Sequence, residues 1–296
     1  MSSNQQQPLP LTFNQNQRPP FKTQLLKWVG NKQRYAHEII SYFPESFDTY
    51  YEPFLGSGAV MATLAPAKGV GSDVLEPLME IWQMLSDSPM TLIEWYESRW
   101  HILRSGDKKT MYEKIKADYN SKPNGADLLF LLRSCYGGVV RFRKDDGYMS
   151  TPCGVHDPIN PQSFARRVYL WHERTNGMTF FQSDFEAIID HAKQGDLVYC
   201  DPPYKDTQAI LYGAQTFTLA RLFTTIARAK ERGVFVVLSI DGSKKTGKKQ
   251  IDISIPNGLF ENEVSVNCGK SMLRRFQKLG ETLEDEVVTD RLLLTY

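Results

Sequence analysis

The chain has 296 residues, of which 41% are hydrophobic and 23% are charged. This composition is ordinary for a soluble globular protein, and the length allows one large domain or two modest ones. The formal net charge of +1 carries little information, but basic residues outnumber acidic ones between Arg99 and Glu173. This local excess favours a polyanionic partner, although a merely solvated basic surface would have the same composition.

Cysteine spacing and hydropathy restrict the compartment and the metal chemistry. The four cysteines are far apart and form no CxxC pair, and the five histidines show no ligand spacing. This argues against a disulfide framework or a metal site. The N-terminus lacks a charged segment followed by an apolar run, and no apolar stretch approaches the roughly 20 residues of a membrane span. We therefore expect a cytoplasmic protein without a metal and without a membrane partner.

The first elements in chain order are an arm and a short helix. Residues 1–20 are rich in Gln, Asn and Pro, which predicts a flexible N-terminal arm. Ile39, Ile40 and Phe43 then have helical spacing, and Pro44 ends that helix.

The next segment has the opening pattern of a nucleotide-binding α/β fold. Residues 48–53 read as a short strand that enters a glycine turn, and residues 59–65 read as the following helix. Residues 68–74 form a second predicted strand closed by Asp73, and another helix is expected over 78–85. Strand, glycine turn, helix, strand and acid in this order predict a doubly wound sheet.

From about residue 86 to 176 the pattern becomes aromatic and basic, with helical pieces and a loop-rich run. The α/β rhythm then returns with three strand-like runs, a helix over 219–232 and a closing antiparallel pair. We therefore predict an α/β protein in which residues 21–85 and 177–296 form a Rossmann-like doubly wound sheet. A mainly helical module with a β-hairpin, residues 86–176, is inserted into it.

The glycine turn favours a nucleotide-like ligand. Gly56 and Gly58 directly follow a strand, where they allow close backbone approach to a ligand. Asp73 lies 17 residues after Gly56, at a strand end where an acid can bind ribose hydroxyls. A dinucleotide fingerprint would need a small residue in place of Met61, and the GKS run at 269–271 lacks the first glycine of a phosphate loop.

The tetrapeptide Asp201-Pro202-Pro203-Tyr204 also follows a predicted strand. A strand-ending turn is the simple interpretation, because proline stops a ladder and Asp starts turns. Alternatively, the Asp201 carboxylate and the Pro202 carbonyl could accept both N–H groups of an exocyclic amine, while Tyr204 stacks on its ring. Such a site suits attack of a base amine on an electrophilic methyl group, and the base would have to leave a duplex to reach it.

Five motifs in one order decide between these interpretations: KWVGNK (27–32), EPFLGSG (52–58), SDV (72–74), SDF (183–185) and DPPY (201–204). Over residues 24–296 this set resembles the DNA adenine methylase (Dam)-type, alpha-group, D12-class adenine-N6 DNA methyltransferases. The resemblance implies a site-specific enzyme of a restriction-modification or orphan system, with S-adenosyl-L-methionine as cofactor and double-stranded DNA as partner. It implies a target-recognition domain at 86–176 and a catalytic domain at 21–85 and 177–296. We expect a monomer, with a cognate restriction endonuclease as a candidate partner in the same system.

The resemblance also assigns site residues. Glu52, Phe54, Gly56 and Gly58 correspond to the bed for the methionine half of the cofactor. Asp184 and Phe185 correspond to its adenine end, and Asp201, Pro202 and Tyr204 to the target-base site. Packing alone remains the alternative for the aromatic residues and for Asp73 and Asp184. The implied catalytic residues are Asp201, Pro202, Pro203 and Tyr204; the implied cofactor-binding residues are Trp28, Lys32, Glu52, Phe54, Gly56, Gly58, Asp73, Asp184, Phe185 and Asp201.

The segment 133–154 reads as a β-hairpin with Asp146-Gly147 at its turn. The family typically has an aromatic–Asn–Gly run and an Asn-Val-Pro run here, whereas this chain has Tyr-Gly-Gly at 136–138 and Ser-Thr-Pro at 150–152. The resemblance therefore predicts neither the usual wedge nor a GATC target. A solvated hairpin is the alternative to a DNA-reading one. A basic loop at 241–249 is a candidate for a grip on the DNA backbone, with a disordered surface loop as its alternative. The expected DNA contacts are Lys27, Arg133, Tyr136, Arg141, Arg143, Lys144 and Pro152.

Other functions stay open at this point. A cytosine-N4 methyltransferase would use the same amine chemistry but usually has Ser in place of Asp201. An RNA or protein amide methyltransferase fits the large basic insert less well. A non-catalytic DNA-binding relative is the alternative from a different functional class.

Overall fold

The computed structural model describes residues 18–203, 217–241, 254–270 and 287–296. Residues 1–17 of the predicted arm, the residue Tyr204 and nearly all of the basic loop after Asp241 lie outside these ranges. Within the described ranges no helix is both long and apolar enough to cross a membrane.

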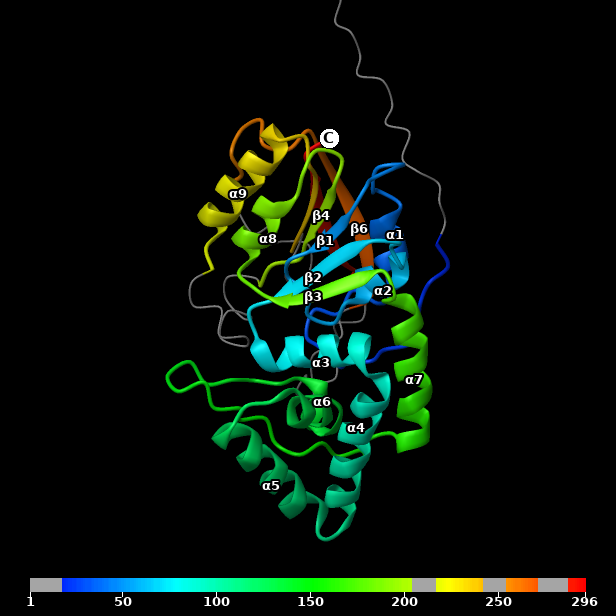
Figure 1. Cartoon of the computed structure of the whole chain (residues 1–296). Helices are drawn as coiled ribbons and strands as arrows, with labels where there is room; N and C mark the ends of the chain where they lie inside the picture. The colour runs from blue at the N-terminus through cyan, green and yellow to red at the C-terminus, as the bar shows by residue number, and fades with distance from the viewer. Residues whose placement is uncertain (1–17, 204–216, 242–253, 271–286) are drawn as a thin grey trace, which may run out of the picture.

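Seven strands of the described chain form one sheet in the order β3-β2-β1-β4-β5-β7-β6 (Figure 1). The strands β1 to β5 pair in parallel, and β7 is antiparallel to both of its neighbours. The strand order reverses between β1 and β4, as in doubly wound folds, so the predicted fold class is confirmed. The strands are β1 (Tyr50–Glu52), β2 (Gly69–Asp73), β3 (Met178–Gln182), β4 (Leu197–Cys200), β5 (Phe235–Asp241), β6 (Asn262–Lys270) and β7 (Val287–Leu294).

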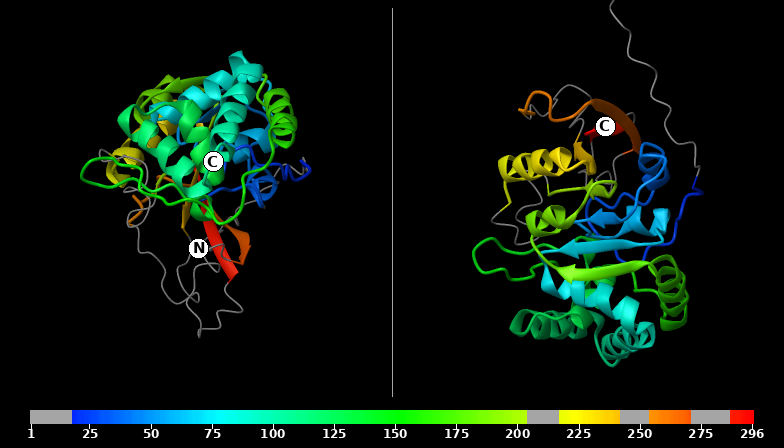
Figure 2. Two further views of the ribbon diagram at one scale, coloured as in Figure 1. Left: turned by 90° about the horizontal axis from the view of Figure 1, so that it is seen from below. Right: turned by 45° about the horizontal axis from the view of Figure 1, so that its top comes forward.

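Helices cover both faces of this sheet (Figures 1 and 2). Successive residues of a strand point to opposite faces, so Leu197 and Tyr199 pack with α1 to α3, whereas Val198 and Cys200 pack with α8 and α9. This explains why β4 is apolar without alternation. The helices are α1 (Ala36–Ile40), α2 (Ala59–Leu64), α3 (Glu76–Asp87), α4 (Pro89–Arg104), α5 (Lys108–Ser121), α6 (Gly125–Ser134), the 3₁₀ turn η1 (Tyr136–Gly138), α7 (Pro161–Arg174), α8 (Phe185–His191) and α9 (Leu219–Glu231).

Helices α4 to α7 belong to the segment that we predicted to be an insertion, and they share a hydrophobic core with one face of the sheet. Trp82 on α3 stacks on Phe180 of β3, with 5.8 Å between the ring centroids. On its other side, Trp82 packs against Trp171 of α7 at 5.5 Å. Aromatic pairs add about 1 kcal/mol each beyond their buried area. The helical layer is therefore joined to the sheet through buried rings.

The predicted hairpin at 133–154 follows a hairpin path without regular strands. Its antiparallel pairing is limited to two isolated bridges, Cys135 with Cys153 and Phe142 with Met149. The turn forms where predicted, with Gly147 at φ 68° and the Arg143 amide 2.9 Å from the Tyr148 carbonyl. The predicted hairpin with its turn at Asp146-Gly147 is therefore present, although its bridges do not extend into a regular ladder. Two consecutive glycines at 137 and 138 take positive φ angles, which interrupts the extended backbone that a ladder needs.

Candidate functional site

An open hollow of about 880 Å³ lies beside the reversal of strand order, where the chain leaves β1 and β4. It is lined by nine of the ten predicted cofactor-binding residues and by Pro203. Gly58 is the exception. Other lining residues belong to the quoted motifs but had no individual role assigned to them: Val29, Gly30, Ser57 and Val74. Val60 and Phe217 lie outside all five motifs.

The glycine turn between β1 and α2 forms one wall of the hollow. Gly56 has φ 47°, and a Cβ there would lie 2.9 Å from Nε1 of Trp28. Gly58 has φ 60°, and a Cβ there would lie 3.0 Å from the Trp82 ring. Gly56 therefore allows Trp28 to lie over the turn, whereas Gly58 allows the turn to pack on the core.

Glu52 is a buried carboxyl at the end of β1, with 3% of its surface exposed. It accepts hydrogen bonds from the Tyr50 hydroxyl at 2.6 Å and from the Met61 amide at 3.0 Å. Burial, together with the nearby Asp201, raises its pKa to about 8, although the hydrogen bonds from Tyr50 and Met61 act in the opposite direction. Glu52 is therefore largely protonated at pH 7, and a cationic ligand would favour its ionised form.

Asp73, at the end of β2, ties two loops of the hollow together. It accepts hydrogen bonds from the Gly56 amide at 3.1 Å and from the Leu75 amide at 3.2 Å. Burial raises its pKa, although these amides act in the opposite direction. The predicted acid at the second strand end thus lies against the predicted glycine turn.

Lys32 lies between two carboxylates. Its ammonium is 3.2 Å from Oδ1 of Asp201 and 2.7 Å from Oδ2 of Asp290. The Tyr35 hydroxyl donates to the same Asp290 oxygen at 3.0 Å. Lys32 and Asp290 are almost fully buried, whereas 20% of the Asp201 side chain is exposed.

Sequence reasoning missed Asp290, although a signal was present. In a strand, residues i, i+2 and i+4 share one face, and Leu292 and Leu294 are core residues on that face. An acid at position 290 is therefore directed inward, where it needs a partner.

Three phenylalanines from separate segments form the far wall. Phe54 stacks on Phe185 with 5.2 Å between centroids, and Phe217 contacts both rings edge-on at 5.7 Å. Phe185 is 2% exposed, so its faces are mostly covered by protein. Phe217 was not indicated by any motif.

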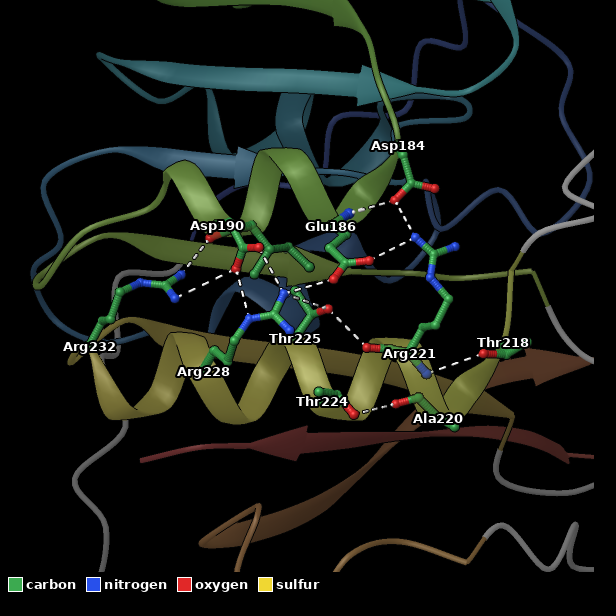
Figure 3. Close-up of polar contacts among 11 residues, drawn as sticks. Asp184, Glu186, Asp190, Thr218, Ala220, Arg221, Thr224, Thr225, Arg228 and Arg232 are labelled. Carbon is green, nitrogen blue, oxygen red and sulfur yellow. Dashed lines mark hydrogen bonds and ion pairs between the residues drawn. The ribbon is translucent and has the colours of Figure 1, made fainter.

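An ion-pair row between α8 and α9 holds this wall in place (Figure 3). Asp184 caps α8 by accepting from the Glu186 amide at 3.0 Å. Arg221 of α9 donates to Asp184 at 3.0 Å and to Glu186 at 2.8 Å, and its guanidinium carbon lies 5.0 Å from the Phe185 ring centroid. Arg228 continues the row to Glu186. Asp184 is thus oriented by both its own helix and the neighbouring one.

The DPPY run begins directly after β4. Asp201 and Pro203 line the hollow, and Pro202 is buried. Tyr204 lies outside the described residues, so its predicted stacking role stays a prediction.

Arg133 corrects one expected DNA contact. It is 5% exposed and donates to the Leu25 carbonyl at 2.7 Å, with the Phe164 ring centroid at 5.8 Å. Burial lowers its pKa to about 10. Because the whole of α6 is buried, Arg133 joins this helix to the N-terminal segment and is not available to DNA.

The other predicted DNA contacts are exposed on or beside the segment 136–152. Tyr136 is 45% exposed. Arg143 lies 4.4 Å above the Tyr148 ring and 3.5 Å from Asp146. Lys27 packs on Gly138: a Cβ added at Gly138 would lie 2.6 Å from Cδ of Lys27. The remaining exposed residues of this set are Arg141, Lys144 and Pro152.

Comparisons with known proteins were made for the whole chain. The family model described as D12 class N6 adenine-specific DNA methyltransferase matches residues 28–258. The type II methyltransferase M1.LlaDCHI of Lactococcus lactis subsp. cremoris is 28% identical over 250 residues, which cover 77% of this chain and 84% of that protein. The DNA adenine methylase of Haemophilus influenzae is 25% identical over 236 residues, or 75% of this chain and 80% of that protein. Among solved structures, the rRNA methyltransferase aviRa from Streptomyces viridochromogenes has 12% identity and a TM-score of 0.32, covering 84% of this chain and 76% of that one. That score is too low to support an argument.

The buried Glu52 generates a prediction about stability and pH. With a folded-state pKa of about 8 and an unfolded-state pKa near ~4.3, the folded protein binds more protons than the unfolded chain between these values. The free energy of unfolding therefore falls as the pH rises through this window. In Glu52→Gln the amide oxygen can still accept from Tyr50 and Met61, but this pH-dependent loss is absent.

We take the difference in free energy of unfolding between Glu52→Gln and the wild type at pH 5 as the reference. As the pH rises to 8, this difference should shift in favour of the variant by on the order of a few kcal/mol. Urea unfolding at a series of pH values measures this difference. Glu263→Gln is the matched control, because Arg291 lowers the pKa of that partly exposed carboxyl and no gain toward pH 8 follows. Parallel curves for the wild type and Glu52→Gln would contradict the prediction.

Proposed function

Because this chain belongs to the D12 class of N6 adenine-specific DNA methyltransferases, we propose that it transfers a methyl group from S-adenosyl-L-methionine to an adenine flipped out of duplex DNA. The observation that carries the proposal is the position of Asp201. It follows β4 at the reversal of strand order and borders the same hollow as the Glu52–Gly56 wall. The acceptor for the target amine thus lies beside the proposed binding site for a nucleotide-like cofactor.

The lining of the hollow suits S-adenosyl-L-methionine, which carries a sulfonium and an ammonium group. Among the residues that the structure describes, four carboxyl side chains and one lysine, Lys32, line it, so a cationic ligand is favoured. Gly56 gives the close approach that its positive φ allows. The lining carboxyls are Glu52, Asp73, Asp184 and Asp201.

The kinds of side chain that line the hollow suggest how the cofactor binds. Asp73 would accept from ribose hydroxyls, and the half-buried Phe54 and Phe217 would offer apolar surface for an adenine ring. Glu52, which is close enough to Asp201 to interact with it, would face the methionine half. When bound, the cofactor supplies an electrophilic methyl group.

Catalysis by this chain rests on orientation and electrostatics. The Asp201 carboxylate and the Pro202 carbonyl would each accept one N–H of the target amine, which directs electron density onto the nitrogen that attacks. Proline fixes φ at both positions after Asp201, so these acceptors are held before the base arrives. Lys32, at 3.2 Å from Asp201, balances the charge of the carboxylate.

The helical layer and the segment 136–152 would act as the target-recognition domain. The exposed Arg141, Arg143 and Lys144 are placed on one projecting segment (Figure 2) and suit phosphate or guanine edges. Lys27, packed on Gly138, connects this surface to the KWVGNK motif that also borders the hollow.

The biological setting is proposed from the substrate and the relatives. We infer that the enzyme acts as a monomer on DNA in the cytoplasm, as part of a restriction-modification system or as an orphan enzyme. The similarity to a protein named a type II methyltransferase supports the former.

Substitution of Asp201 tests the proposed chemistry. Asp201→Asn should lower kcat by about 100-fold or more, because one preset acceptor for the amine becomes a mixed donor and acceptor. Unmethylated genomic DNA serves as substrate, and N6-methyladenine and N4-methylcytosine are quantified by mass spectrometry after hydrolysis.

Two controls accompany this measurement: the melting temperature, and calorimetric binding of S-adenosyl-L-methionine. The melting temperature should stay close to that of the wild type, and S-adenosyl-L-methionine should still bind, with a lower affinity because one lining carboxylate is lost. Wild-type rates in Asp201→Asn would refute the mechanism, and N4-methylcytosine as the product would refute the base assignment.

Substitution in the projecting segment tests the DNA surface. Arg141→Gln together with Arg143→Gln should weaken binding to all sequences and lower the slope of log K against log salt by about 2, or about one unit per lost phosphate contact. Fluorescence anisotropy with a duplex between 50 and 200 mM salt gives this slope. Arg228→Gln, which breaks the row on α9 instead, is the matched control and should leave the slope unchanged. An unchanged slope in the double variant would place the DNA elsewhere.

A further inference from the structure

The strand β7 carries an acid into the interior of the protein. It lies between β5 and β6 and is antiparallel to both, with Asp290 opposite Val266 of β6. Asp290 shares its face with Leu292 and Leu294, which pack in the larger hydrophobic core, and it is 3% exposed. Burying an ionised carboxyl costs several kcal/mol unless it is paired, so its partners decide what it does.

Two side chains from the N-terminal segment contact Asp290. The Lys32 ammonium lies 2.7 Å from Oδ2 of Asp290, and the Tyr35 hydroxyl donates to the same oxygen at 3.0 Å. The ammonium also lies 5.8 Å from the centroid of the Tyr35 ring. Two contacts on a single carboxylate thus fix the end of a flexible lysine side chain.

The same ammonium reaches the DPPY run. It lies 3.2 Å from Oδ1 of Asp201, a longer contact than the one to Asp290. One cation therefore bridges an inaccessible carboxylate on β7 and a partly exposed one after β4. The inaccessible carboxylate makes the shorter contact, so it determines where the ammonium lies.

We propose that Asp290 is a positioning residue for methyl transfer: with Tyr35, it holds the Lys32 ammonium at the place from which Lys32 orients the Asp201 carboxylate toward the target amine. This inference rests on the proposed role of Asp201. It gives β7 a role in the reaction, although Asp290 belongs to none of the five sequence motifs. Asp290 touches neither base nor cofactor in this role, and it acts through Lys32.

A double-mutant cycle tests the route through Lys32. Asp290→Asn should lower kcat by about 10- to 100-fold, since a displacement near 1 Å at a reacting group has effects of this size. Asp290→Glu, which keeps the charge, should recover part of the loss. In a Lys32→Met background, Asp290→Asn should cause no further loss of kcat, because the residue that it acts through is already absent.

Arg291→Gln is the matched control. Arg291 neighbours Asp290 on the same strand but pairs with the exposed Glu263 at 2.6 Å, so kcat should stay at the wild-type value. Melting temperatures of all variants show whether each is folded at the assay temperature. Wild-type kcat in Asp290→Asn, or an equal loss of kcat in the presence and absence of Lys32, would overturn the proposal.

A second measurement does not depend on activity. In a crystal structure of free Asp290→Asn, the Lys32 ammonium should have left its wild-type position and moved toward Asp201, its remaining carboxylate partner. An ammonium that keeps its wild-type position in that variant would overturn the proposal, whether or not the enzyme methylates adenine. Failure of the proposed function is seen separately, as the absence of N6-methyladenine in the wild-type reaction.

Discussion

The parallel pairing of β1 with β4 is the constraint on which the site depends. Tyr50 is in register with Leu197 and Tyr51 with Val198, so the residues after these two strands leave the sheet side by side. The segments that follow β1 and β4 then lead to helices on opposite faces of the sheet. A crevice is left between these two segments at the end of the strands. Glu52 and Asp201 are brought close by this pairing, and their mutual repulsion contributes to the raised pKa of Glu52. The hollow and its charge thus have one cause.

Burial gives the polar groups around the hollow their fixed positions. Lys32, Glu52 and Asp290 are each at most 4% exposed. Lys32 donates to Asp290, and Glu52 accepts from the Tyr50 hydroxyl and the Met61 amide. Such groups cannot reorient toward water, so they keep their direction when a ligand enters. Removing these groups from water lowers the stability of the fold. Such a loss of stability is common where polar groups are preorganised for a reaction.

Much of this arrangement could be predicted from the chain itself, because local patterns carry it. The glycine turn at 56–58, the acid Asp73 and the run after β4 each depend on a strand followed by a turn. The residues that were missed or misassigned depend on packing between distant segments. Asp290 meets Lys32 across 258 positions, and Arg133 is buried because the carbonyls of residues 24 and 25 lie against α6. Phe217 joins the aromatic wall only through the placement of α9, which no motif indicates.

The rings that join α3, β3 and α7 have a consequence for how target specificity can be altered. Trp82 is in contact with both Phe180 and Trp171, and the Trp171 indole donates to the carbonyl of Thr23 at 2.9 Å. The helical layer and the catalytic sheet are therefore built on shared side chains. Exchange of residues 86–176 with the corresponding segment of a relative would cut through this core. A chimera would need the rings and the N-terminal segment of its donor as well. With the proposed role of the segment 136–152 in target recognition, changes within that segment are therefore a simpler route to a new specificity than an exchange of the whole helical layer.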